Sequence, residues 1–140
     1  MKAHADHPVW QTVAPELTPR DFRHPHEMDA DFLLLLSKAR RLAGVPFRIV
    51  SDYRPPEQNA AAGGATKSAH MESPCRAVDL RVHNNEERFR IVDALRRVGL
   101  ERIGIYVPTD WQRTTYGPAA GTIHVDDSRV NPRPRMWLEW

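Results

Sequence analysis

The stretch Ser68-Ala-His-Met-Glu-Ser-Pro-Cys-Arg-Ala-Val-Asp-Leu-Arg-Val82 decides how this chain of 140 residues is interpreted. It places His70 in a polar loop and Asp79 inside a short apolar run with the pattern of a β-strand. A second such run, Thr122–Asp126, carries His124 between two β-branched residues. An ionisable side chain is unfavourable in an apolar strand unless it is paired or binds a metal. Two histidines and a carboxylate suit a zinc ion with one open position, so we predict a metal site.

Each of these residues also has an ordinary explanation. A single histidine in a polar loop, such as His70, is usually a surface residue. Asp79 has arginine neighbours, Arg76 and Arg81, with which it could form an ion pair. Three residues of metal-ligand type in unfavourable places are harder to explain separately than together. The metal site is therefore the preferred interpretation.

Asp126 and Arg54 are further candidates for the same site. Side chains at i and i+2 of a strand point to one face, so we expect Asp126 to lie beside His124. There it either orients a ligand histidine or accepts the proton of an activated water, unless it is only the first residue of a turn. Arg54 follows a predicted strand, where its guanidinium would hold a substrate carboxylate or remain a solvated loop side chain.

The bulk composition is that of an ordinary globular protein. Hydrophobic residues make up 41% of the chain and charged residues 27%, with a net charge of +2. The sequence has no basic stripe of the kind that would indicate nucleic-acid binding. Its single cysteine excludes an internal disulfide. We find no apolar leader and no run of the roughly 18 apolar residues that a membrane span needs. We expect one monomeric domain over residues 1–140, without a membrane span and cytoplasmic as written.

Helical and strand patterns are interspersed without a steady rhythm, which favours the α+β class. We expect an irregular arm over residues 1–26 with one capped turn at Leu17–Phe22. Helices are expected over residues 28–43 and from a cap at Asn84 or Asn85 to Gly99. The apolar stripe predicted for the second helix is Phe89, Val92, Leu95 and Val98.

The remaining segments are strands and loops. Strands are expected over residues 46–51, 76–82, 102–107 and 122–126. Residues 52–67 are expected to form a long loop around one short helix, and residues 108–121 a second loop. A C-terminal tail is expected over residues 131–140.

Several motifs together resemble one family of enzymes. They are Ser51-Asp-Tyr-Arg54, Asn59 with Gly63-Gly64, Ser68-Ala-His70, Ala77-Val-Asp79 and His124-Val-Asp126. With the opening Leu17–Phe22, they make nearly the whole chain resemble the zinc D-Ala-D-Ala carboxypeptidase and murein endopeptidase family, in particular the small branch of phage lysins. Its members share a fold with the hedgehog signalling domain. The resemblance implies a small antiparallel sheet flanked by helices, zinc on His70, Asp79 and His124, Arg54 facing a substrate carboxylate, and Ser68 near the metal.

Two features depart from the family pattern. The segment after His70 is two residues longer than usual and lacks a glycine, so we expect a bulge that brings Glu72 and Cys75 beside the metal. Cys75 is then an extra ligand or, more simply, a small buried residue. Many members carry an acidic general base three residues before the last histidine, where this chain has Gly121. Asp126 or Glu72 would have to take that catalytic role.

The resemblance implies a zinc metallopeptidase that hydrolyses an amide bond in peptidoglycan stem peptides or cross-links, as a carboxypeptidase or an endopeptidase. Its site of action would be the cell wall or periplasm. The glycine at position 121 supports an alternative. In that alternative the chain is a non-catalytic zinc- or peptidoglycan-binding module, or a phage structural component with a degenerate site.

Overall fold

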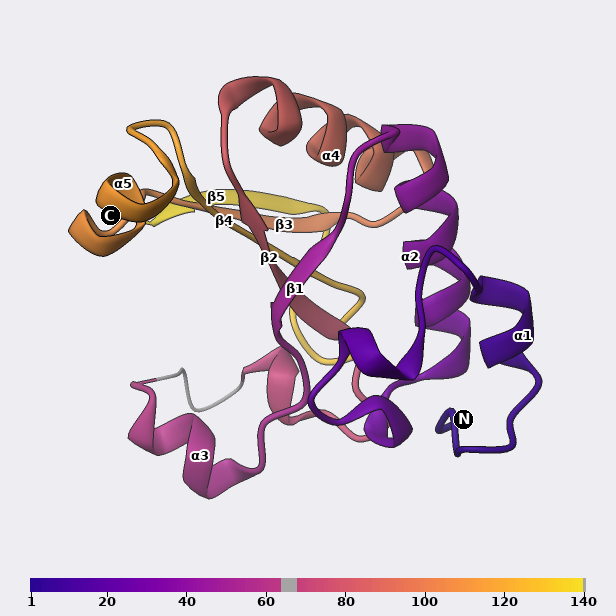
Figure 1. The fold of residues 1–140 in the computed structure, drawn as a ribbon. Coiled ribbons are helices and arrows are strands. Elements are labelled where there is room, and N and C mark those ends of the chain that lie inside the picture. Colours follow the sequence, from indigo (N-terminus) through magenta and orange to yellow (C-terminus); the bar gives the residue numbers. More distant parts are fainter. Residues whose placement is uncertain (64–67, 140) are drawn as a thin grey trace.

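A computed structural model describes residues 1–63 and 68–139, and an open β-sheet forms the centre of this part of the chain (Figure 1). In these residues the sheet has five strands in the order β1-β2-β4-β3-β5. Neighbouring strands are antiparallel except β3 and β5, which are parallel. The strands are β1 (Arg48–Ser51), β2 (Ala77–Val82), β3 (Arg102–Tyr106), β4 (Gly121–Asp126) and β5 (Arg135–Glu139). The predicted α+β class is confirmed.

Helices lie on both sides of this sheet. The helices are α1 (Val9–Val13), α2 (Ala30–Ala43), α3 (Pro56–Ala61), α4 (Asn85–Arg97) and α5 (Asp110–Tyr116). The long helices α2 and α4 pack against each other, and α3 and α5 lie at the opposite side of the molecule (Figure 1). Within residues 1–63 and 68–139, no helix is long and apolar enough to cross a membrane.

The ends of both long helices follow from their capping residues. The Asp29 side chain accepts a hydrogen bond from the Phe32 N–H at the start of α2. Gly44 ends α2 in the left-handed conformation, with φ of 68°. Asn84 accepts from the Glu87 N–H at the start of α4. The caps at Gly44 and Asn84 agree with the sequence prediction, whereas α2 begins at Ala30, two residues after its predicted start.

The predicted apolar stripe of α4 is wrong at Phe89, which is 71% exposed. The buried face is formed instead by Ile91, Ala94 and Leu95. Ile91 is two residues from Phe89, or about 200° around a helix, so the two side chains point in nearly opposite directions. Leu95 lies one turn after Ile91 and therefore shares its face.

The segments expected as the 108–121 loop and the C-terminal tail contain regular structure. Helix α5 begins at a capping box, in which Thr109 Oγ1 accepts from the Gln112 N–H and Gln112 Oε1 accepts from the Thr109 N–H. This Thr-x-x-Gln signal is present in the sequence, so the expectation of a loop throughout is wrong. Strand β5 pairs with β3 although its own residues are mostly exposed, which explains why its pattern does not predict a strand.

The central strands carry one apolar face and one ionisable face. The apolar face packs in the core with α2 and α4, and its members include Val78, Leu80, Ile103, Ile123 and Val125. The alternate positions of the same strands carry Asp79, Arg102, His124 and Asp126. Strand alternation thus places the ionisable side chains together on the face away from the core.

Candidate metal centre

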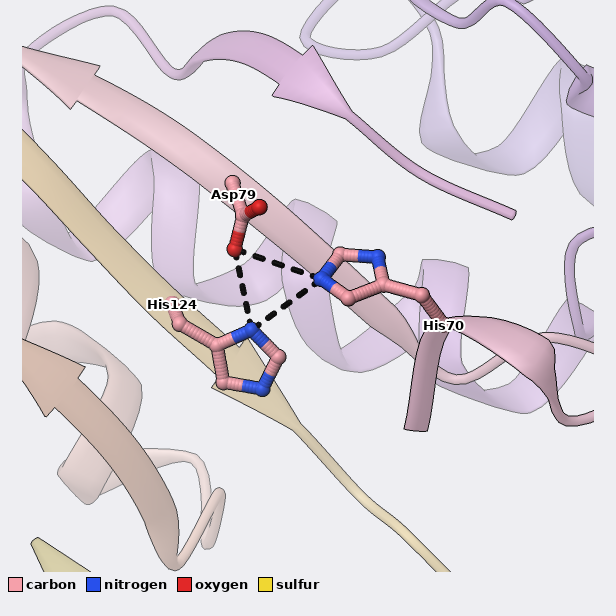
Figure 2. A group of neighbouring side chains, drawn as sticks. All are labelled: His70, Asp79 and His124. Carbon is pink, nitrogen blue, oxygen red and sulfur yellow. Dashed lines mark hydrogen bonds and ion pairs between the residues drawn. The ribbon is translucent and has the colours of Figure 1, made fainter. Parts of the chain in front are cut away.

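The side chains of His70, Asp79 and His124 converge at the ionisable face of the sheet (Figure 2). Asp79 and His124 are direct partners across the β2–β4 pair, and His70 comes from the short turn Ala69–Met71. His124 Nδ1 lies 2.9 Å from Asp79 Oδ1 and 3.2 Å from His70 Nε2. The third side of this triangle, from His70 Nε2 to Asp79 Oδ1, is 3.3 Å.

This triangle has the size and chemistry of three zinc ligands. Zinc binds histidine nitrogen and carboxylate oxygen at ~2.0–2.1 Å in tetrahedral geometry, which places neighbouring ligand atoms about 3.3 Å apart. The three observed separations lie close to that value. The histidines are almost fully buried, whereas Asp79 remains partly exposed toward the open side. The residues present therefore fit a zinc ion with an accessible fourth position.

Backbone contacts fix the orientation of His70. Its Nδ1 lies 2.6 Å from the Asp52 carbonyl oxygen, and because a carbonyl can only accept, Nδ1 carries the proton. The lone pair of Nε2 is then directed at the ligand triangle. The backbone of the loop is held as well: the Arg54 N–H donates to the His70 carbonyl, and Ser68 Oγ accepts from the His70 N–H.

Asp126 orients the second histidine in the same manner. Its carboxylate accepts from His124 Nε2 at 2.6 Å, so His124 Nδ1 is the atom that faces Asp79 and His70. Asp126 is 1% exposed and is also bound by Arg102 Nε at 2.8 Å. Contacts to metal-ligand histidines of this kind fix the tautomer and the ring orientation.

The charges of the triangle stabilise one another. Burial alone would lower the pKa of His124, but hydrogen bonds to Asp126 and Asp79 outweigh it and raise this pKa to about 9. Burial would raise the pKa of Asp79, but contacts with His124 and His70 hold it well below its usual range. Asp79 is therefore ionised at neutral pH, as a metal ligand must be.

Asp52 supports the site in a way that sequence reasoning missed. Its buried carboxylate accepts from the backbone N–H groups of Arg23 and His24 and contacts His24 Nδ1. The N-terminal segment is thereby tied to the residue whose carbonyl orients His70. The only signal for this in the sequence is an aspartate placed directly after a strand.

The triangle opens into a pocket of about 1040 Å³. Arg54 and Ser68 line it on the side of β1 and the Ala69–Met71 turn. The other side comes from β3, β4, α5 and β5, and its lining includes Tyr106, Gln112, Thr122, Trp137 and Glu139. Sequence reasoning predicted the first side and missed the second, because α5 and β5 were not expected as regular structure.

Trp137 enters the pocket through a close approach to Gly104. A Cβ atom on Gly104 would lie 2.6 Å from the indole of Trp137, so only glycine leaves room for this side chain. The indole lies with its ring centroid 5.5 Å from that of His124 and 5.2 Å from the Arg102 guanidinium carbon. Strand β5 thus completes the wall beside the second histidine.

The structure places Glu72 and Cys75 outside the ligand triangle. Glu72 Oε1 accepts from the Arg129 N–H and Oε2 is buried without a partner, and Glu72 does not line the described part of the pocket. The Cys75 thiol is buried and approaches the carbonyls of His70 and Ala77, and burial raises its pKa to about 12. The segment between His70 and Ala77 is also held in place by an earlier part of the chain, because the Cys75 backbone pairs with residues 27–29.

Gly121 lies on the face opposite to His124, three residues away along a regular strand. A Cβ atom on Gly121 would come within 2.8 Å of the Tyr106 carbonyl oxygen. A carboxylate at this position would neither fit the strand pairing nor point into the pocket.

The ordinary explanation for Asp79 does not hold. Arg76 forms ion pairs with Asp29 and Asp127 instead. Arg81 is directed at the hydroxyl of Tyr116. The Asp79 carboxylate therefore contacts His70 and His124 instead of an arginine.

Comparison with models of protein families gives a match. The model of the family described as Peptidase M15 matches residues 17–113, which is more than half of the chain. This range contains His70 and Asp79 and ends before His124. A search of curated proteins finds no match. The resemblance that the motifs predict is thereby confirmed, and the chain belongs to the Peptidase M15 family.

Proposed function

We propose that this chain is a zinc-dependent peptidase that hydrolyses an amide bond in peptidoglycan stem peptides or cross-links, acting in the cell wall or periplasm. The observation that carries this proposal is the triangle of His70 Nε2, Asp79 Oδ1 and His124 Nδ1 at the base of an open pocket. A closed structural site would have four protein ligands, whereas a catalytic site keeps one position for water or substrate. Membership of a peptidase family supports the reaction class.

His70, Asp79 and His124 would hold the zinc ion. When bound, zinc supplies a Lewis acid that polarises a carbonyl and activates water at neutral pH. The Asp52 carbonyl and the Asp126 carboxylate keep the two imidazole rings in the ligand orientation. Asp126 acts as an orienting residue in this proposal, because its oxygens are already bound to His124, Arg102 and the Ser128 N–H.

Arg54 and Ser68 would bind the substrate. The Arg54 side chain lines the pocket, and its Nε is buried without a hydrogen-bond partner. An unpaired buried donor on a guanidinium is costly, and a substrate carboxylate would satisfy it in a bidentate contact. Ser68 lines the same side and holds the loop that carries His70.

In this proposal, Tyr106 would donate a hydrogen bond to the scissile carbonyl. It lines the pocket from β3, on the same face as its strand partner Thr122. Burial raises the pKa of Tyr106 above its usual value, and the Asp79 carboxylate adds to the effect. The phenol therefore stays protonated and can donate a hydrogen bond to a developing oxyanion.

Digestion of purified soluble muropeptides tests the proposal. The zinc-loaded protein is expected to produce new amine termini that mass spectrometry assigns to one bond. Asp79→Asn keeps the shape of the side chain but removes the ligand charge, so it should abolish cleavage. His26→Ala, at an exposed histidine away from the pocket, is the control and should cleave normally. A zinc-loaded, folded wild type that leaves all muropeptides intact would contradict hydrolysis.

One observation supports a second function, a zinc-dependent peptide-binding module that does not cut. Within the described residues, no carboxylate is both free of protein partners and adjacent to the ligand triangle, because Asp79 and Asp126 are both paired. A side chain at position 121 would lie on the opposite face of the sheet. For such a module, isolated cell walls would retain the zinc-loaded protein and release no peptide, and retention would be lost in Asp79→Asn.

A further inference from the structure

Two opposite charges that line the pocket have no side-chain partner within residues 1–63 and 68–139. Among the described residues, the acids Asp79 and Asp126 are bound to histidines, and Arg102 is bound to Asp126. Arg54 and Glu139 also line the pocket, and in the described part of the chain neither side chain forms an ion pair or a hydrogen bond. Of the charged side chains that the structure describes in this pocket, one cation and one anion are therefore available to a ligand.

These two charges lie on opposite sides of the ligand triangle. Arg54 follows β1, at one edge of the sheet, and its backbone N–H binds the His70 carbonyl. Glu139 ends β5, at the other edge. The triangle rests on β2 and β4, between these edges. Figure 1 shows the same arrangement, with the end of β5 near α5 on one side and the chain that leaves β1 toward α3 on the other.

Glu139 faces the pocket because of its register. It pairs with Tyr106 on β3, which in turn pairs with Thr122 on β4, and all three line the pocket. Burial is the main cause of the raised pKa of Tyr106, and smaller contributions come from Asp79 and Glu139, which raise this pKa, and from Arg54, which lowers it. Glu139 is nevertheless two strands from β4, about 10 Å at the usual strand spacing. This is too far to contact the reacting atoms and is suitable for a charged group several bonds away.

We propose that Glu139 determines specificity by binding a primary ammonium group on the acyl side of the scissile amide, while Arg54 binds a carboxylate on the other side. The substrate class is then a zwitterionic stem peptide that lies across the strands, with its amine toward β5. This inference rests on the proposed peptidase function and adds the charge pattern and the direction of its substrate.

A pair of synthetic stem peptides tests the inference. Both contain a lysine-type third residue, followed by the scissile region and a free carboxylate, and they differ only in whether the side-chain amine is free or acetylated. The zinc-loaded wild type should prefer the free amine by about fivefold in kcat/KM, the upper range for a solvent-accessible ion pair. Glu139→Gln should reduce this ratio to about one, and Glu139→Lys should invert it.

Glu101→Gln is the matched control. Glu101 is an exposed glutamate at the other end of the β3–β5 pair, and it lies outside the lining of this pocket. This variant should keep the wild-type preference. Loss of the preference in Glu101→Gln would show a general effect of surface charge and overturn the assignment to Glu139.

Binding of the same two peptides, measured as thermal stabilisation of the zinc-loaded protein, separates this inference from the peptidase proposal. Stronger binding of the free amine without cleavage of either peptide would support the Glu139 subsite and contradict hydrolysis. Equal cleavage of both peptides by the wild type would support hydrolysis and overturn the subsite. Neither binding nor cleavage of either peptide would contradict both.

Discussion

The two walls of the pocket are built in different ways. The ligand wall consists of His70, Asp79 and His124, held by the Ala69–Met71 turn and the central strands β2 and β4. The C-terminal wall consists of α5 and β5, including Trp137, at one edge of the sheet. The ligand wall is fixed by buried hydrogen bonds, whereas the C-terminal wall depends on the close approach of Trp137 to Gly104. The first wall carries the candidate metal ligands, and the second carries Trp137 and the charge of Glu139.

Among the substitutions that test the two walls, loss of a zinc ligand should have the largest effect, and it should lower zinc affinity. His70→Ala or His124→Ala should lower zinc affinity by more than about a hundredfold, because removal of a supporting contact alone typically costs 10- to 100-fold. Affinity can be measured by competition with a chromogenic chelator. His26→Ala should bind zinc as the wild type does. Unchanged zinc affinity in His70→Ala would contradict the assignment of His70 as a zinc ligand.

Removal of the support behind His124 should have the next largest effect. Asp126→Asn keeps the shape but loses the ion pair with Arg102 and the strong acceptor for His124 Nε2. We expect zinc affinity to fall about 10- to 100-fold, less than for a lost ligand. The same competition assay measures it. A loss as large as that of His124→Ala would instead indicate that Asp126 binds the metal itself.

The difference between the walls explains what could be predicted from the sequence. Asp79 and His124 are ionisable residues inside apolar strands, and this local contradiction is visible without a structure. The role of Trp137 is not, because it depends on pairing with β3, more than thirty residues earlier in the chain, and on the missing side chain of Gly104. The length of the loop predicts Glu72 beside the metal, although its position depends on the contact with the Arg129 N–H.

Gly104→Ala tests the C-terminal wall. The new Cβ would clash with the indole of Trp137, and overpacking of this kind costs about 1–3 kcal/mol of unfolding free energy. Chemical denaturation measures the cost. In a Trp137→Ala background, the same substitution should cost much less, since its clash partner is gone. Equal costs in the two backgrounds would show that the indole is not the constraint.

The pH dependence of zinc binding tests the charges of the ligand wall. The pKa of His124 is raised to about 9, so this residue is protonated at neutral pH in the metal-free protein. Zinc must displace that proton, and its affinity should rise about tenfold per pH unit between pH 7 and 9. Titrations corrected for chelator protonation measure this slope. An affinity that is constant over this range would mean that His124 is neutral or not a ligand.

The smallest effect is expected for Glu72→Gln. Glu72 contacts the Arg129 N–H and lies outside the pocket lining, so zinc affinity and peptide cleavage should stay within about twofold of the wild type. A strong loss of cleavage at full zinc occupancy would restore Glu72 as the catalytic acid or base that the sequence suggested.

The most direct test of the central claim is the rate of muropeptide cleavage while zinc is added back to the metal-free, folded protein. We expect no cleavage without zinc, a rise in rate with added zinc, and saturation at one zinc per chain. Cleavage at full rate by the metal-free protein, or saturation with zinc and no cleavage, would contradict it.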